Sequence, residues 1–221
     1  MQTPPSEQPR FVVLLRYGLL ILAGILQAFS TAWPWDEKGS ASGTLQVLAL
    51  AAALVLLQGM RFSVLQGMRF SEYAAPIHAR QRLWQGFWRG WCFATAWLTA
   101  TFWWLFISLH TYGGLPGWSA ALAVLLLAAA LALYYAIAFA IWSWALPHAG
   151  MARRVVLFAA LWLVAELCRG VFFTGFPWGA IGYAHVDSVL AGYASWIGVY
   201  GIGALAAASA GCLSALPALF M

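Results

Sequence analysis

Two oppositely charged residues, Glu166 and Arg169, stand inside the apolar stretch LWLVAELCRG. Residues three apart lie on one face of an α-helix, so this spacing places both charges on the same side. Two interpretations stay open: a buried ion pair that fixes helix packing, or a pair that orients the apolar turn in RGVFFTGFPWGAIGYA (169–184) for a substrate. Both predict that losing one partner destabilises the fold more than losing both, because a lone charge stays desolvated.

Other residues with reactive side chains lack the neighbours that chemistry needs. Cys168 lies two positions from Glu166, on a different helical face, and no His or Lys is near in sequence to activate its thiol. The segment GVYGIGA (198–204) lacks the features of a phosphate loop and favours a small-residue helix interface. No metal site and no cofactor are expected, because the histidines are isolated and lack paired spacing: His78, His110, His148 and His185.

Tryptophans are concentrated in FWRGWCFATAWLTATFWWLF (87–106). Trp88, Trp91, Trp103 and Trp104 lie near the ends of this stretch, where interfacial tryptophans are common in membrane helices. Trp97 lies in the middle and has two open interpretations, a contact between helices or a wall against a lipid acyl chain.

The composition indicates how these residues are held. Hydrophobic residues make up 64% of the chain and charged residues 8%, against roughly a quarter charged in soluble proteins. Continuous Leu, Ala, Val and Trp runs favour helices over the alternating strands of a barrel. The basic residues are scattered between apolar runs, which argues against a nucleic-acid partner. The expected fold class is all-α, a polytopic transmembrane helical bundle.

Hydropathy predicts about six membrane-spanning helices. Basic residues gather before the first, between the second and third, and between the fourth and fifth, which places the N-terminus in the cytoplasm and the 169–184 turn on the opposite side. The predicted spans are about 11–31, 44–60, 84–108, 118–146, 154–173 and 190–216.

Three blocks of sequence resemble a known family: FWWLFISLHTYGGLPGW (102–118), AELCRGVFFTGFPWGAIGYA (165–184) and GVYGIGAL (198–205). They are similar to the membrane part of bacterial apolipoprotein N-acyltransferase. The resemblance implies an inner-membrane, multi-pass enzyme that moves an acyl chain from a phospholipid to the N-terminal amine of S-diacylglyceryl-cysteine in lipoproteins. In that family a cysteine thioester carries the acyl chain, served by a glutamate and a lysine of a nitrilase-like domain inserted after the seventh of eight helices.

The resemblance also implies what this chain lacks. It stops after the sixth predicted helix, so the nitrilase-like domain and its catalytic Glu, Lys and Cys are expected to be absent, no catalytic residue is assigned, and the chain alone is expected to be inactive. Its partners would be a phospholipid acyl donor, a diacylglyceryl apolipoprotein acceptor and membrane lipids. On this hypothesis Glu166 and Arg169 brace a periplasmic lipid entrance formed by Trp104, His110, Phe176, Pro177, Trp178 and Tyr183.

Two other function classes compete with this hypothesis. A small six-helix transporter or channel would suit the number of spans, but no pair of spans looks like an inverted repeat and intramembrane ionisable residues are few. A non-catalytic membrane scaffold is the other alternative.

Overall fold

The computed structural model describes residues 10–32, 40–58 and 78–216. Within these ranges the chain forms helices and turns and no strand, which confirms the all-α fold class. Leu- and Ala-rich runs favour helix, and a helix satisfies its own backbone groups where no water is available. The α-helices are α1 (Arg10–Phe29), α2 (Gly43–Gln58), α3 (Ala79–Thr101), α4 (Trp103–Ile107), α5 (Gly117–Ala145), α6 (Met151–Val171) and α7 (Ala194–Ala215).

Within the described residues, helices occur at all six predicted places, and four or five stretches are candidate membrane spans. In the part of the chain that the structure describes, four stretches are long and apolar enough to cross a membrane: Arg10–Phe29, Gly117–Ala145, Met151–Thr174 and Val189–Ala215. The α3–α4 pair would be a fifth if the bent pair counts as one span. Helix α2 has 16 residues and so covers about 24 Å, which is less than the roughly 30 Å hydrocarbon core of a bilayer.

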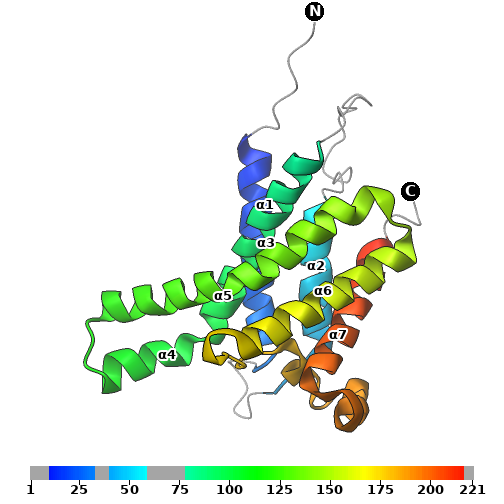
Figure 1. The fold of residues 1–221 in the computed structure, drawn as a ribbon. Helices are drawn as coiled ribbons and strands as arrows, with labels where there is room; N and C mark the ends of the chain where they lie inside the picture. The colour runs from blue at the N-terminus through cyan, green and yellow to red at the C-terminus, as the bar shows by residue number, and fades with distance from the viewer. Residues whose placement is uncertain (1–9, 33–39, 59–77, 217–221) are drawn as a thin grey trace, which may run out of the picture.

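Within the expected span over 84–108 the helix bends by 54° where α3 passes into α4. Neither glycine nor proline stands at the bend. Instead the Thr101 hydroxyl donates to the Trp97 carbonyl at 2.9 Å, a back-bond that tends to bend helices. Beyond the bend, α4 and the π-helical turn η2 (Ser108–Tyr112) point away from the bundle beside the N-terminal half of α5 (Figure 1).

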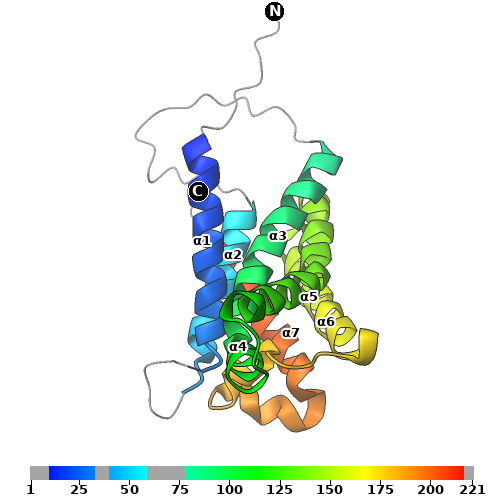
Figure 2. The ribbon, with the colours of Figure 1, turned by 90° about the vertical axis from the view of Figure 1, so that its left-hand side faces the viewer.

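Close helix contacts assemble the rest of the bundle around α3. At Gly90 of α3, a Cβ would lie 2.6 Å from the Cβ of Phe139 on α5, and at Gly86 one would lie 2.5 Å from the Ser143 hydroxyl. Small residues let membrane helices approach closely in this way. In Figure 2, α1 and α2 stand on one side of α3, and α5 and α6 on the other.

The structure decides between the two interpretations of Trp97. Its side chain is fully buried, and its ring lies 5.0 Å from that of Tyr135 and 5.7 Å from that of Trp162. Trp97 therefore joins α3 to α5 and α6 in an aromatic core and does not face lipid.

Candidate functional site

The two charges predicted to share a face of α6 are both fully buried in the bundle. No hydrogen bond joins Glu166 directly to Arg169 among the described residues. Instead, the Tyr135 hydroxyl of α5 accepts from Nε of Arg169 at 2.9 Å and donates to Oε1 of Glu166 at 3.5 Å. The expected ion pair is thus a bridged triad. The Tyr135 hydroxyl bonds to both charged side chains at once, and buried charges need hydrogen bonds of this kind.

Helix α7 closes over this triad. A Cβ at Gly203 would lie 3.4 Å from Oε2 of Glu166, so a glycine lets the α7 backbone pass close to the carboxylate. Gly203 belongs to the 198–204 segment for which the sequence favours a small-residue helix interface, and here it makes one.

The triad holds the turn that follows α6. One guanidinium nitrogen, Nη1 of Arg169, donates to the carbonyls of Phe176 and Trp178, each at 2.6 Å. The backbone N–H of Phe176 donates in return to the Arg169 carbonyl at 2.8 Å. Oε1 of Glu166 accepts from the backbone N–H of Ile181 at 3.1 Å. Charge-assisted bonds of this kind are roughly twice as strong as neutral ones, so the loop from 176 to 181 is tied to α6 at both ends.

The backbone entering the turn is strained. Phe173 and Thr174 have φ of 54° and 73°, and Gly175 follows with φ of 78°. Non-glycine residues in this region cost of order 1–3 kcal/mol each and persist only where the surroundings impose them. Phe173 is also 95% exposed, so the strain presents an aromatic side chain outward rather than burying it.

Four aromatic rings connect the turn to the bend between α3 and α4. Phe102, fully buried at the bend, lies 4.9 Å from the Phe176 ring, and Phe176 lies 4.9 Å from Trp178. Trp178 reaches Trp104 of α4 at 6.3 Å. The inner pair, Phe102 and Phe176, anchors the turn, while Trp104 and Trp178 are exposed. We call these four residues the aromatic lip.

The structure brings only part of the proposed entrance together. Trp104, Phe176 and Trp178 touch, with Pro177 exposed between the last two. Tyr183 is exposed on the 3-10 turn η5 (Ile181–His185). The remaining member, His110, lies in η2, where its Nδ1 lies 2.7 Å from the Leu115 carbonyl oxygen. It therefore belongs to the arm formed by α4 and η2, which points away from the bundle, and not to the lip.

Two members of the site were not among the sequence-predicted residues, Tyr135 and Phe102. Each stands in a long apolar run, where an aromatic residue resembles its lipid-facing neighbours. A polar hydroxyl in mid-span was a usable signal for Tyr135, because such a group needs a partner away from water.

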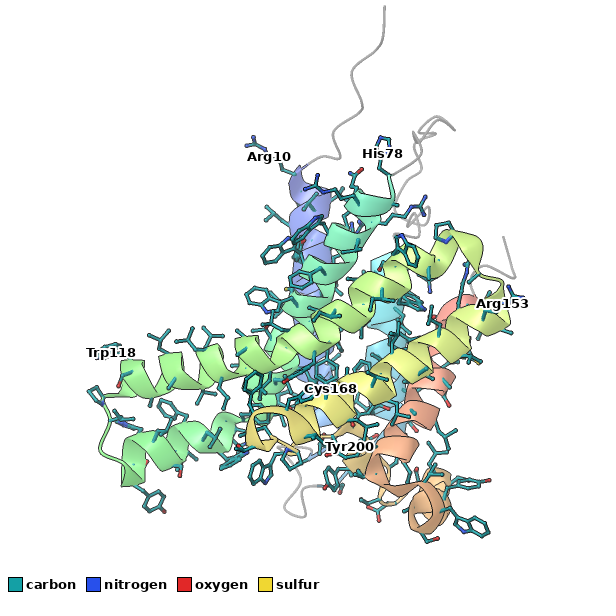
Figure 3. The ribbon with its side chains drawn as sticks, viewed as in Figure 1. Arg10, His78, Trp118, Arg153, Cys168 and Tyr200 are labelled. Atoms are coloured by element: carbon teal, nitrogen blue, oxygen red, sulfur yellow. The ribbon has the colours of Figure 1, made fainter. Side chains whose placement is uncertain are left out.

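Cys168 is half-buried on α6, between the two charges in sequence (Figure 3). In the described ranges, no three His, Cys, Asp or Glu side chains come together as metal ligands do. The aromatic lip presents apolar rings at the surface, and Arg169 of the buried triad fixes the backbone beneath them.

A second polar cluster lies where η5 meets α2. Nε2 of His185 lies 3.0 Å from Oε1 of Gln46, and Nδ1 lies 3.1 Å from the Ser188 hydroxyl. The ring packs so close to α2 that a Cβ at Gly43 would collide with it. His185 is buried, and this burial lowers the pKa of its imidazole from the ordinary 6.5.

Because His185 is buried, we expect the fold to lose stability at acidic pH. The unfolded chain binds a proton at His185 near pH 6.5, whereas the folded chain resists protonation, so stability is full above about pH 6.5 and falls as pH drops toward the lowered pKa. We expect the melting temperature to fall between pH 8 and pH 5.5 and this fall to shrink in His185→Gln. The matched control is His110→Gln, on the exposed arm, which should keep the full pH dependence; an unchanged slope in His185→Gln would contradict the assignment.

Comparison with known proteins gives one consistent result. A family model described as the apolipoprotein N-acyltransferase N-terminal domain matches residues 73–212. A protein of Verminephrobacter eiseniae named apolipoprotein N-acyltransferase is 47% identical over 189 residues, covering 85% of this chain and 31% of that protein. One of the same name from Ralstonia nicotianae is 47% identical over 146 residues, covering 64% of this chain and 28% of that protein. The chain thus spans less than a third of the length of these two relatives.

Proposed function

Because this chain belongs to the apolipoprotein N-acyltransferase N-terminal domain family, we propose that it is a membrane domain that admits lipid acyl chains to an acyl-transfer reaction. The reaction would be the transfer of an acyl chain from a phospholipid to the N-terminal amine of a diacylglyceryl-cysteine lipoprotein. Its covalent steps would belong to a nitrilase-like domain, and this multi-pass membrane chain would bind and position the lipids.

One observation carries the proposal: the Arg169 guanidinium donates to two carbonyls of a turn whose exposed side chains are apolar. A turn at a helix end is ordinarily polar, because it meets water. Here Phe173 is 95% exposed and Trp178 54% exposed. Two buried charges thus hold aromatic side chains at the surface, where they suit acyl chains better than water.

The aromatic lip would act by positioning lipid acyl chains for the reaction. Holding reactants in a productive geometry removes part of the entropic barrier of a reaction between two molecules. The inner rings, Phe102 and Phe176, are fixed by packing, and Arg169 fixes the backbone on both sides of Pro177. Trp104 and Trp178 would then present a rigid aromatic surface to a lipid chain that arrives from the bilayer.

The orientation follows from charge. Arg10 lies at the end of the bundle away from the turn, as does His78 at the start of α3 (Figure 3). The exposed residues Arg80 and Arg153 begin α3 and α6, whereas the lip follows their opposite ends. Basic residues favour the cytoplasmic side, so we infer that the aromatic lip faces the periplasm.

A substitution in a full-length relative tests the lip. Trp178→Ala removes an exposed aromatic surface without opening the core, so we expect acyl transfer to fall roughly tenfold, which corresponds to about 1.4 kcal/mol, while membrane insertion stays intact. The measurement is the rate of N-acylation of a diacylglyceryl peptide in mixed micelles. Trp88→Ala, a similarly exposed tryptophan in the N-terminal half of α3, is the matched control. Unchanged transfer in Trp178→Ala would remove the proposal.

A further inference from the structure

At the end of the bundle opposite the aromatic lip, two arginines lie within helices instead of in connections. Arg16 stands six residues after Arg10, where α1 begins, and Arg89 stands ten residues after Ala79, where α3 begins. Both side chains are half-buried, on two helices that pack directly against each other, since a Cβ at Gly24 of α1 would lie 2.5 Å from the Phe93 carbonyl oxygen of α3. Like charges brought together in a membrane protein need a compensating group.

Arg89 is held in place by its neighbours. Nη1 donates to the Leu57 carbonyl near the C-terminal end of α2, and Nη2 donates to Oε1 of Gln85, each at 3.3 Å. These two bonds fix the plane of the guanidinium but use only part of its five N–H donors. Arg16 makes no hydrogen bond to another described residue. The pair therefore offers unused donors from a partly preorganised position.

No carboxylate of the described ranges neutralises this pair. The described acidic residues are Glu166 and Asp187. Glu166 is engaged by Tyr135 and Ile181 near the aromatic lip, and Asp187 follows η5, on the same side of the bundle as the lip. The compensating anion must therefore come from outside these parts of the chain.

The short length of α2 would bring lipid headgroups to the level of Arg16 and Arg89. Over its described residues, Gly43–Gln58, α2 is shorter than the hydrocarbon core, and both α1 and α3 extend past this part of it (Figures 1 and 2). A short span draws the bilayer surface inward or lets flanking residues reach it. The exposed Trp84 and Trp88, whose stacked rings lie 6.5 Å apart on α3, mark the same level as an interface.

We propose that Arg16 and Arg89 bind the phosphate of an anionic phospholipid from the leaflet at this end of the bundle. A guanidinium matches two phosphate oxygens with parallel N–H donors, and two guanidiniums on adjacent helices can share one phosphate. The bound lipid would neutralise both charges and link α1, α2 and α3 at the point where α2 ends. This site is separate from the aromatic lip and goes beyond the proposed function.

Melting temperatures of the full chain in neutral detergent test the site, with phosphatidylglycerol, phosphatidylcholine or inorganic phosphate added. We expect a saturable rise in melting temperature with phosphatidylglycerol only. In R16Q/R89Q the apparent affinity for this lipid should fall roughly 25-fold, taking about fivefold for each basic residue. The matched control is R10Q/R153Q, which removes the same charge from exposed residues near the same membrane surface and should keep the affinity.

Three results would overturn the proposal. An equal loss of affinity in R10Q/R153Q would mean that surface charge alone attracts the lipid. An equal rise with inorganic phosphate would indicate a site for a free anion, and an equal rise with phosphatidylcholine would show that no anionic headgroup is needed. If R16Q/R89Q does not fold, R16Q keeps the bonds of Arg89 to Leu57 and Gln85 and should by itself show about a fivefold loss. An unchanged affinity in R16Q would equally contradict the site.

Discussion

Replacing Arg169 with leucine should lower the free energy of unfolding by about 3–5 kcal/mol, the range for removing one partner of a buried charged group. The side chain is fully buried, and its loss would leave the carbonyls of Phe176 and Trp178 without their donor. It would also leave the Glu166 carboxylate in the bundle without a nearby positive charge. Thermal unfolding in detergent micelles, followed by tryptophan fluorescence, would measure the loss.

Because Tyr135 bridges the two charged side chains, removing Glu166 and removing Arg169 should cost different amounts of stability. In Glu166→Leu, Arg169 keeps Tyr135 and both carbonyls, while the Tyr135 hydroxyl and the Ile181 N–H lose their acceptor. We therefore expect Glu166→Leu to cost less than Arg169→Leu, and the double variant to cost less than the sum. Arg153→Leu, an exposed arginine at the start of the same helix, should change stability by less than about 0.5 kcal/mol. A similar loss in Arg153→Leu would mean that the buried network is not the cause.

The sequence predicts the class of fold and the polar centre of the site because both follow from local rules. Apolar runs give the helices within a few residues, and a spacing of three puts Glu166 and Arg169 on one face. The bridging Tyr135 comes from another helix, 31 residues away in sequence, and helical periodicity carries no information about such a contact. The direct ion pair was therefore the natural expectation, although a third side chain mediates it.

The bend at Phe102 explains why the structure brings only part of the predicted entrance together. On a straight helix His110 would continue the line of Trp104, and both would lie beside the turn. The bend carries η2 outward with the arm, so that Trp104 stays at Trp178 and His110 does not. Hydropathy along the chain reports apolar character but not direction, and α4 consists of apolar residues throughout.

A valine in place of Gly24 should be among the most destabilising single substitutions in the bundle, at about 3 kcal/mol, the upper end for overpacking a core. A Cβ at Gly24 of α1 would lie 2.5 Å from the Phe93 carbonyl oxygen and 2.9 Å from the Trp97 backbone nitrogen. Because backbone atoms of α3 cannot turn away as a side chain can, the two helices would have to separate. Gly24 and Ala28 form the small-xxx-small pattern of close helix contacts. A hydropathy profile does not detect this pattern, although it is present in the sequence.

The same helix supplies the control. A Cβ at Gly18 would meet no atom within 4 Å, so Gly18→Val changes the same residue type in α1 without touching α3. Valine has a higher helix propensity than glycine by a few tenths of a kcal/mol, so Gly18→Val should leave stability unchanged or raise it slightly, whereas Gly24→Val should lower it. Melting temperatures of the two variants, compared with the unmodified chain, measure both effects. Since the α1–α3 contact also holds Arg16 near Arg89, Gly24→Val should weaken phosphatidylglycerol binding although it changes no charge. Equal melting temperatures for Gly18→Val and Gly24→Val would contradict the close contact of α1 with α3.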